Sequence, residues 1–410
     1  MHDDADTPAA TAPDDRPDPP PAPRFASRVD RVGAFRAMEV GKRAAALEAG
    51  GADVVRMNLG EPDHDVPPRV VEAMARAVRG RSAYTPALGL AELRSGIARW
   101  HAEALGADVA PERVIVTAGA SAALLLVAAA LVEPGDEILV ADPSYPCNRR
   151  FVEAFGGVAR LVPTDASTRF QLTSALVESH WSERTRGVLV ASPSNPTGTS
   201  VPHAELVALS KAVERRGGHR VVDEIYLPLG FGERPRSILA DDPGAISVGS
   251  FSKFFAMPGW RLGWAVVPET MVATVERLAQ NFYICPSAPA QRAALECFDP
   301  DTLALCEARR AGFAARRDRA LAGLADGGWR VPVVPDGAFY AWLDVGELGV
   351  PATELARRLL DEAHVALAPG PDFGERDAES RLRLSYACSE DDIDRAAERL
   401  GRWRRAHGPG

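Results

Sequence analysis

Lys253 stands in an unusual sequence context, because Phe251, Phe254 and Phe255 flank it. Lysines are seldom buried without a purpose, since removing an ammonium group from water is costly. Desolvation lowers the pKa of a lysine, and the neutral amine is the form that attacks a carbonyl group to make an imine. The sequence therefore indicates a candidate nucleophilic amine, and imine formation is the chemistry that suits it.

Three further polar groupings follow short β-branched runs. They are residues 119–121 after 114–117, residues 192–198 after 188–190, and Asp223 with Glu224 after 221–222. Each has a plain structural explanation: a tightly packed turn for 119–121, a simple turn for 195–198, and a helix cap or ion pair for Asp223. The functional alternative for 119–121 is anion binding, because a turn that opens a helix has free backbone N–H groups.

Motifs of several other enzyme classes do not occur in the sequence. Without a G-x-G-x-x-G or a G-x-x-x-x-G-K-S/T, the nicotinamide and P-loop interpretations lack their fingerprint. The nucleophile elbow G-x-S-x-G is missing too. The eight histidines show no H-x-x-x-H or H-E-x-x-H spacing and no local cluster with cysteine, so we expect no metal site.

The elements that must position these residues are predicted to alternate between strands and helices. Short β-branched runs recur at 114–117, 138–140, 159–162, 188–190, 221–222 and 246–248. The clearest helix between them is 203–216, whose apolar residues fall on one side. Such alternation needs crossover connections, so we predict an α/β fold with a mainly parallel sheet covered on both faces. Sites in such sheets lie beyond the carboxyl ends of the strands, where the polar groupings fall.

Length and composition place the chain among ordinary globular proteins. Its 410 residues favour two or three domains, and 46% apolar and 25% charged residues are typical of that class. A net charge of −9 argues against nucleic acid as the main partner. Five scattered cysteines without a C-x-x-C indicate a reducing compartment, so we expect a cytoplasmic protein.

Three stretches invite a second interpretation. Residues 1–24 hold seven prolines and six aspartates and no aliphatic run, so we predict a disordered tail, with a regulatory or docking segment as the alternative. Residues 114–132 carry no charge over 19 residues, a length that suggests a membrane span. We interpret them as a strand, a turn of small residues and a buried helix over 122–131, and expect no membrane partner. Residues 402–405 are interpreted as the solvated end of a helix, not as a basic patch for nucleic acid.

Taken together and in this order, the groupings resemble the class I/II aminotransferases, enzymes of the aspartate aminotransferase fold (fold type I) that use pyridoxal 5′-phosphate (PLP). The resemblance extends from about Val29 to Arg402. Its landmarks are 58–63, 84–86 with Gly89, 192–198, 223–226, 250–253 with 259–263, and 383–385. It implies an α/β fold, in which a large PLP-binding domain carries a mainly parallel seven-stranded sheet flanked by helices and a smaller domain is α+β.

The same resemblance implies how the chain is divided. After the tail, residues 25–59 would form the N-terminal segment of the small domain, residues 60–295 the large PLP-binding domain, and residues 296–410 the C-terminal small domain. This last part contains a strand-like run at 338–343 and a helical run at 353–363. Closure of the small domain over the substrate would exclude water from the site.

By position in this pattern, the resemblance implies roles around the cofactor. Lys253 would form the internal aldimine with PLP and then carry a proton between the substrate and the cofactor. Asp223 would pair with the pyridine nitrogen and keep it protonated, so that the ring accepts electrons. Asn195 and Tyr226 would hydrogen-bond to the phenolic oxygen, and Tyr145 would stack on the ring.

Other residues would hold the anionic groups. The phosphate would bind at a helix N-terminus and neighbouring side chains, namely Gly119, Ala120, Ser121, Ser250, Ser252 and Arg261. Arg383 would hold the substrate carboxylate with a pair of hydrogen bonds, helped by Asn195 and the backbone of Gly60. Tyr84 matches a tyrosine that reaches the phosphate of the neighbouring subunit, which implies a homodimer with shared sites.

The resemblance implies a transaminase that moves an amino group between an L-amino acid and a 2-oxo acid by a ping-pong mechanism, in amino acid metabolism or biosynthesis. β-Elimination or decarboxylation is the alternative, because the same Lys253–Asp223 pair serves those PLP reactions. A non-enzymatic regulator or scaffold is a third possibility, against which the retained Lys253 argues. Dicarboxylate-specific relatives often carry an arginine where this chain has residues 281–286, which include none. This favours alanine, another neutral or aromatic amino acid, or a specialised biosynthetic substrate.

Overall fold

The structure, a computed structural model, describes residues 24–26, 29, 33 and 35–407. The α-helices and β-strands of the described residues belong to one compact unit, residues 34–410. The predicted disordered tail lies, except for Arg24, outside the described residues. The division of residues 25–410 into a large and a small domain stays a prediction.

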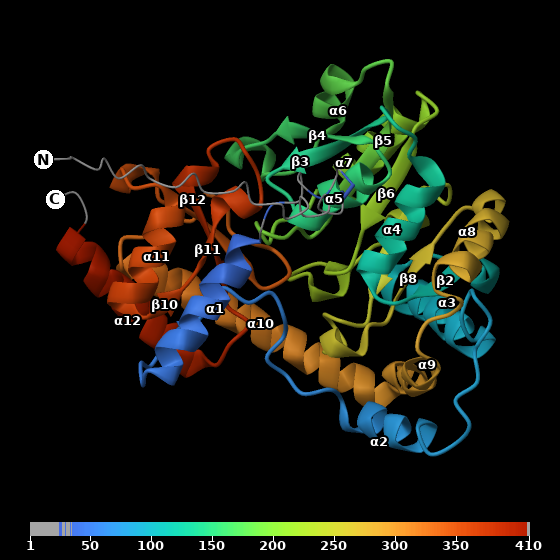
Figure 1. The fold of residues 1–410 in the computed structure, drawn as a ribbon, viewed down its shortest axis with the longest axis horizontal. Coiled ribbons are helices and arrows are strands. Elements are labelled where there is room, and N and C mark those ends of the chain that lie inside the picture. Colours follow the sequence, from blue (N-terminus) through green and yellow to red (C-terminus); the bar gives the residue numbers. More distant parts are fainter. Residues whose placement is uncertain (1–23, 27–28, 30–32, 34, 408–410) are drawn as a thin grey trace, which may run out of the picture. The chain divides into compact units, whose positions relative to one another are not determined.

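A seven-stranded sheet forms the centre of this unit, in the order β2-β8-β7-β6-β5-β3-β4. Its strands are β2 (Val114–Thr117), β3 (Glu137–Asp142), β4 (Val158–Pro163), β5 (Thr185–Ala191), β6 (His219–Asp223), β7 (Ile246–Ser250) and β8 (Gly263–Val266). β8 pairs antiparallel with β2 and β7, and the other pairs of the sheet are parallel. The α/β fold with a mainly parallel sheet is thus confirmed (Figure 1).

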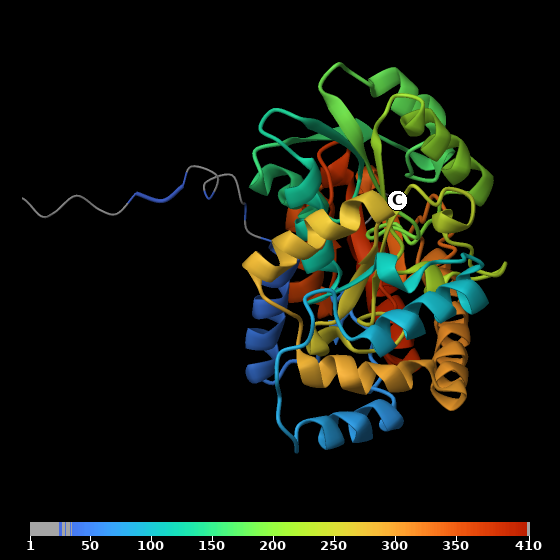
Figure 2. The same cartoon turned by 90° about the vertical axis from the view of Figure 1, so that its right-hand side faces the viewer.

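Helices cover both faces of the sheet. One face carries α3 (Ala91–Leu105), α6 (Ser174–His180) and α7 (His203–Glu214), and the other carries α4 (Ala120–Leu131), α5 (Pro146–Ala154) and α8 (Glu269–Phe282). Successive residues of a strand face opposite sides of the sheet. Val188 and Val190 therefore pack in the core on the side of α3, α6 and α7, and Leu189 packs in the core on the side of α4, α5 and α8. Figure 2 shows the gold α8 packed across α4. Because the strands are apolar on both faces, each face of the sheet must be covered by helices to be kept from water.

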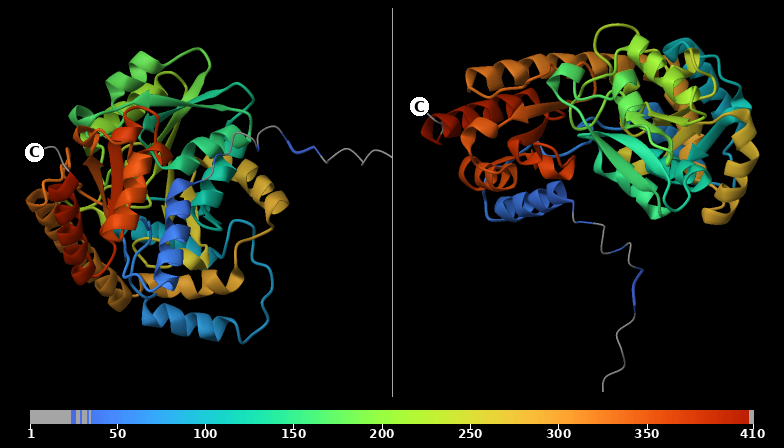
Figure 3. Two further views of the ribbon diagram at one scale, coloured as in Figure 1. Left: turned by 60° about the vertical axis from the view of Figure 1, so that its left-hand side comes forward. Right: turned by 90° about the horizontal axis from the view of Figure 1, so that it is seen from above.

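A second group of strands lies outside the central sheet. β9 (Tyr340–Asp344), β11 (Ala368–Pro369) and β12 (Arg381–Ser385) form an antiparallel sheet in the order β11-β12-β9. β1 (Val55–Arg56) pairs parallel with β10 (Val365–Ala366), which joins segments from opposite ends of the chain. The surrounding helices are α1 (Arg36–Ala49), α10 (Pro300–Asp326), α11 (Ala352–Ala363) and α12 (Glu390–His407). Figure 3 shows the blue α1 beside the orange and red C-terminal elements.

Several predicted elements appear with small shifts of their ends. The uncharged stretch 114–132 divides into β2 and α4, as predicted, and α4 begins two residues earlier, at Ala120. Among the described residues, no helix is long and apolar enough to cross a membrane. Residues 402–405 lie in the last turns of α12, as predicted, but they are only partly solvated, because Trp403 packs into the core and is 6% exposed. The remaining helices, α2 (Pro68–Ala77) and α9 (Ala288–Ala294), pack against each other.

Candidate active site

The predicted site residues come together because five parallel strands of the central sheet end at the same edge. Residues 119–121 follow β2, Tyr145 follows β3, and Asn195 follows β5. Asp223 is the last residue of β6, and Ser252 and Lys253 follow β7. Chain segments that leave the carboxyl ends of adjacent strands are neighbours in space. The sheet therefore brings together side chains that lie far apart in the sequence, of which residues 119 and 253 are the most distant pair, at 134 positions.

Because β8 runs antiparallel to its neighbours, its first residue lies at the same edge of the sheet. Gly263 opens β8 and pairs with Thr117 and Ser250, which are the last residues of β2 and β7. Arg261, two residues earlier, therefore lies beside the N-terminus of α4. Its φ of 52° costs a non-glycine residue about 1 kcal/mol, and its Nη1 donates a 2.9 Å hydrogen bond to the carbonyl oxygen of Pro258.

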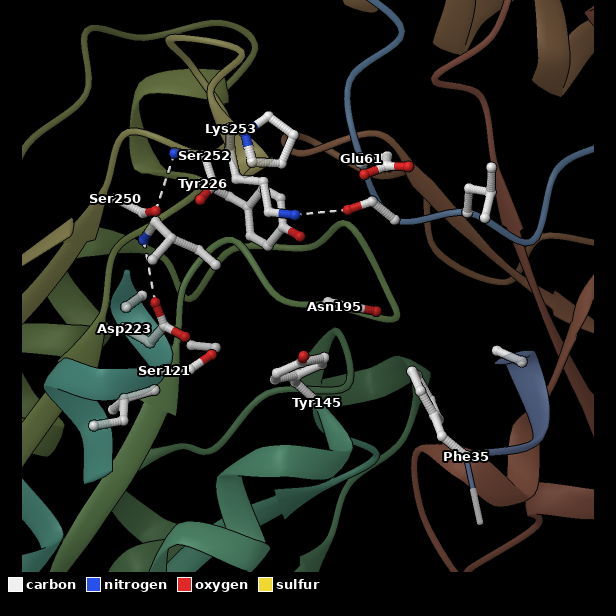
Figure 4. Close-up of a pocket in the computed structure, with 18 of the residues that line it drawn as sticks. Phe35, Glu61, Ser121, Tyr145, Asn195, Asp223, Tyr226, Ser250, Ser252 and Lys253 are labelled. Atoms are coloured by element: carbon white, nitrogen blue, oxygen red, sulfur yellow. Dashed lines mark hydrogen bonds between the residues drawn. The ribbon is translucent and has the colours of Figure 1, made fainter. Parts of the chain in front are cut away.

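These segments enclose a cavity of about 460 Å³ (Figure 4). Twelve of the predicted site residues line it: Gly60, Ala120, Ser121, Tyr145, Asn195, Asp223, Tyr226, Ser250, Ser252, Lys253, Arg261 and Arg383. The sequence-based selection of these residues therefore corresponds to one place in the structure. Their chemical roles remain proposals.

Two predicted residues do not line the cavity. Gly119 precedes α4 at a φ of 87°, and a Cβ there would lie 2.5 Å from Nη2 of Arg261. Gly119 thus lets the guanidinium approach the start of the helix closely. Tyr84 is 80% exposed and lies away from the cavity of its own chain.

Lys253 projects into the cavity, and its Nζ donates a 2.6 Å hydrogen bond to the carbonyl oxygen of Gly60 (Figure 4). Removal from water lowers the pKa of Lys253 to about 8, with Glu61 opposing and Arg383 adding to this effect. Nζ also lies 5.7 Å from the centre of the Tyr226 ring and 6.0 Å from that of Phe339. The amine therefore becomes neutral much closer to physiological pH than an exposed lysine.

Asp223 is a buried carboxylate at the end of β6, and its Oδ1 accepts a 3.2 Å hydrogen bond from the backbone of Ile225. Burial raises the pKa of Asp223 to about 7, and the neighbouring Glu224 adds to the rise, whereas Lys253 opposes it. No residue that the structure describes forms an ion pair with Asp223, so the carboxylate is suited to receive a positively charged group of a ligand.

Two tyrosines complete the wall between these groups. Tyr226 is 3% exposed, and burial raises its pKa well above the ordinary value, so the phenol keeps its proton. Tyr145 lies across the cavity and presents its ring to the space in front of Asp223 (Figure 4). Burial likewise raises the pKa of Tyr145. Both hydroxyl groups are therefore available as hydrogen-bond donors at neutral pH.

Arg383 enters the cavity from β12 and is 2% exposed. Its Nη1 donates a 3.0 Å hydrogen bond to Oδ1 of Asn195, and its Nη2 donates a 2.6 Å hydrogen bond to the carbonyl oxygen of Asn58. These partners are an amide and a carbonyl oxygen, and no carboxylate of the described residues pairs with Arg383. A buried guanidinium in this state is costly, so an anionic ligand would satisfy it. The fork of donors is suited to a carboxylate.

Several wall residues were not among the predicted ones. Glu61 belongs to the landmark 58–63, so its position was visible in the sequence although no role was assigned to it. Phe35 directly precedes α1, and Met38 lies in its first turn. No motif marks them, because only the folded chain places α1 beside β11, α11 and β10.

The residues present fit PLP in three independent respects. Arg261 and the N-terminus of α4 lie together at one end of the cavity and form a cationic cradle that fits a phosphate. Asp223 offers a buried negative charge to a protonated ring nitrogen. Lys253 offers a primary amine with a lowered pKa to an aldehyde. Among the described residues, no three His, Cys, Asp or Glu side chains gather in a way that could hold a metal ion.

Comparison with known proteins agrees with this geometry. The family model described as aminotransferase class I and II matches residues 52–400. A valine–pyruvate aminotransferase of Mycobacterium tuberculosis is 36% identical over 90% of this chain and 96% of its own length. An aspartate/prephenate aminotransferase of Thermus thermophilus is 35% identical over 92% of this chain and 97% of its own.

Solved structures show the same likeness at the level of the fold. An aminotransferase from Mycobacterium tuberculosis superposes with a TM-score of 0.90 at 35% identity, over 94% of this chain and all of the other. Aspartate aminotransferase from Thermus thermophilus with maleate superposes with a TM-score of 0.88 at 34% identity, over 93% of this chain and all of the other. The similarity extends over almost the whole described chain, in sequence and in structure alike.

Proposed function

The chain belongs to the class I and II aminotransferases, PLP-dependent enzymes that transfer amino groups, and we propose that Lys253 and Asp223 are the residues on which its activity depends. The observation that carries this proposal is their placement: both face one cavity from the ends of the adjacent strands β6 and β7. Amino transfer, not elimination or decarboxylation, is the activity that the named relatives share.

The cofactor would be held at its phosphate, at its ring nitrogen, at its phenolic oxygen and on the face of its ring. The backbone of 119–121 with Ser121, Ser250, Ser252 and Arg261 would bind the phosphate, and Asp223 would pair with the ring nitrogen. Asn195 and Tyr226 would hydrogen-bond to the phenolic oxygen, and Tyr145 would stack on the ring. When bound, PLP supplies an electron-accepting ring that stabilises negative charge at the substrate carbon beside the nitrogen.

Lys253 would bind the cofactor covalently and also move the proton. The neutral form of Nζ would take the proton from the α-carbon of the amino acid, and the charged form would then donate that proton on the cofactor side. A pKa of about 8 lets the amine serve in both forms near neutral pH. The carbonyl oxygen of Gly60, 2.6 Å from Nζ, holds the amine on the substrate side of the cavity.

Arg383 would bind the α-carboxylate shared by every amino acid and 2-oxo acid substrate. Its two hydrogen bonds, to Asn195 and to the carbonyl of Asn58, fix the plane of the guanidinium before a substrate arrives. Such preorganisation removes part of the entropy cost of binding. Backbone at Gly60 would complete this pocket.

We propose that the preferred substrates have uncharged side chains. Among the described residues that line the cavity, the cationic ones are Lys253, Arg261 and Arg383, and each of these has a role at the cofactor or the α-carboxylate. Glu61 adds a negative charge to the wall, which would repel a second carboxylate. Phe35 and Met38 add apolar surface on the substrate side.

A screen of amino donors tests this preference. Alanine, valine, phenylalanine, aspartate and glutamate would each be offered with pyruvate and with 2-oxoglutarate as acceptors, in excess and one pair at a time. We expect larger kcat/KM values for the neutral donors than for aspartate. A preference for aspartate would overturn the substrate proposal and leave the assignment of Lys253 and Asp223 unaffected.

We also propose that the enzyme is a homodimer in which Tyr84 reaches the phosphate of the neighbouring site. Tyr84 is 80% exposed, a high value for an aromatic side chain that has no role in its own chain's cavity. Phe282 and Ile284, each 50% exposed, add apolar surface of the kind that interfaces cover.

Two further proposals concern organisation and location. We propose that residues 25–59 and 296–410 form a small domain that closes on the large one, residues 60–295. The β1–β10 pair supports this by joining the two segments.

We propose a role in amino acid metabolism or biosynthesis. We propose that the protein acts in the cytoplasm, since all five cysteines carry free thiols. Fractionation of cells that produce the protein would test the location.

A further inference from the structure

The hydroxyl groups of two buried tyrosines, Tyr226 and Tyr340, lie 2.8 Å apart. Tyr226 follows β6 and lines the cavity, whereas Tyr340 opens β9 and stands behind the cavity wall. Both side chains are at most 3% exposed, so water does not compete for this hydrogen bond. The contact joins residues 114 positions apart and links the second sheet to the end of the central one.

Tyr340 is fixed by two other groups of the site. The guanidinium carbon of Arg383 lies 4.7 Å from the centre of the Tyr340 ring, a cation–π distance. Gly60 lies against the hydroxyl so closely that a Cβ there would be 2.8 Å from Oη of Tyr340. The phenol therefore has one well-defined orientation, in which Tyr226 is its hydrogen-bond partner.

The direction of this hydrogen bond matters, because a phenol has a single proton to donate. If Tyr226 donated to Tyr340, it would have no proton left for an acceptor in the cavity. Burial raises the pKa of both hydroxyl groups and Arg383 lowers both, but the guanidinium of Arg383 lies against the ring of Tyr340, 4.7 Å from its centre, so we expect Tyr340 to be the better donor of the two. Donation from Tyr340 leaves the proton of Tyr226 free to point into the cavity.

We propose that Tyr340 is a positioning residue, which donates its hydroxyl proton to Tyr226 and thereby turns the hydroxyl of Tyr226 toward the cofactor's phenolic oxygen. This inference rests on the proposed role of Tyr226. A donor that itself accepts a hydrogen bond is polarised and donates more strongly. Tyr340 would thus help to stabilise the ionised form of the phenolic oxygen without touching the cofactor.

The test is a pH titration of the visible absorbance of the holoenzyme, with no substrate present. Hydrogen bonds donated to the phenolic oxygen favour its ionised form and so lower the midpoint of the titration. We expect Tyr226→Phe to raise the midpoint, and Tyr340→Phe to raise it by a smaller amount, about one pH unit or less. In the Tyr226→Phe background, Tyr340→Phe should cause no further shift.

Tyr386→Phe is the matched control. Tyr386 is also fully buried, and its backbone N–H donates a hydrogen bond to the carbonyl oxygen of Phe339, the residue before Tyr340, but its hydroxyl has no hydrogen-bond partner among the described residues. We expect its removal to leave the midpoint unchanged. If Tyr340→Phe also left the midpoint unchanged, or if its effect persisted in the Tyr226→Phe background, the positioning role would be wrong. If Tyr226→Phe had no effect, the proposed role of Tyr226 itself would fail.

Discussion

The side chains of Arg383 and Asn195 are joined by a 3.0 Å hydrogen bond from Nη1 to Oδ1. Arg383 belongs to β12 and Asn195 to the loop after β5, so the bond spans 188 positions of sequence. Both side chains are buried. Because Asn195 is proposed to contact the cofactor and Arg383 the substrate, the bond fixes the distance between the two ligands.

Arg383→Lys should therefore weaken the binding of every substrate. Lysine keeps the positive charge but loses the planar fork, so it cannot hold both Asn195 and a carboxylate. We expect kcat/KM to fall by about 100-fold for amino acids and 2-oxo acids alike, mainly through KM. Steady-state kinetics with two donors and two acceptors would measure it.

Arg381→Lys serves as the control for this variant. Arg381 lies on the same strand and pairs with Asp344 at 3.1 Å, outside the cavity. Its replacement should leave KM within a factor of about two. Equal losses in the two variants would show that the effect comes from damage to β12.

Asp223→Asn should stabilise the cofactor-free protein at alkaline pH and not at acid pH. The pKa of Asp223 rises from 3.8 to about 7 on folding, so the folded chain binds more protons between these values. The contribution of Asp223 to stability is thus fully present below about 3.8 and is lost as the pH rises through about 7. At pH 8 the variant should be more stable by a few kcal/mol, and at pH 3.5 the two should be equal.

Thermal denaturation of both cofactor-free proteins across this pH range would measure the difference. With PLP bound, the order should reverse, because the ionised carboxylate then gains its cationic partner. A stability difference that did not depend on pH would contradict the assignment of the raised pKa to Asp223.

Lys253→Ala and Tyr84→Ala should restore each other's activity when the two inactive proteins are mixed and allowed to exchange subunits. In the hybrid dimer, one site receives Lys253 from one chain and Tyr84 from the other, and is intact. Random exchange should recover about a quarter of the wild-type activity. Mixing Lys253→Ala with Arg383→Ala is the control, since Arg383 lines the same chain's cavity as Lys253 and no intact site can form. Equal recovery in the two mixtures would contradict a shared site.

Glu61→Gln should improve the use of aspartate relative to alanine. Removing the negative charge from the cavity wall relieves repulsion of a second carboxylate. The exposure of Glu61 to solvent limits the gain to roughly two- to fivefold in the ratio of the kcat/KM values. Glu183→Gln, before the start of β5 at the opposite edge of the sheet, should leave the ratio unchanged. An unchanged ratio in Glu61→Gln would contradict the role of its charge.

Much of the fold could be predicted from local patterns. The β-branched runs that begin at 114, 138, 188 and 246 all lie in strands, because residues such as Leu189 and its neighbours Val188 and Val190 are apolar on both faces. β8 was not predicted as a strand. It is only four residues long, Gly263–Val266, and begins with glycine, so neither length nor composition marks it.

The site could be predicted where it follows strand ends, since parallel strands bring those positions together regardless of their distance in sequence. Phe35, Met38 and Tyr340 could not be found in this way. They reach the site from α1 and β9, whose positions depend on packing between segments from both ends of the chain. The sequence pattern around these residues indicates a helix and a strand, but it does not show which other segments the two elements pack against.

The most direct test of the central claim is a single half-reaction, with PLP-loaded enzyme and one amino acid but no 2-oxo acid acceptor. For the wild type, and for the control Lys211→Ala in the exposed part of α7, we predict release of one equivalent of 2-oxo acid per site as the visible absorbance of the cofactor shifts. For Lys253→Ala, which should still fold and bind PLP, we predict a rate at least about 1000-fold lower. Release of the 2-oxo acid by Lys253→Ala at the wild-type rate would contradict the account.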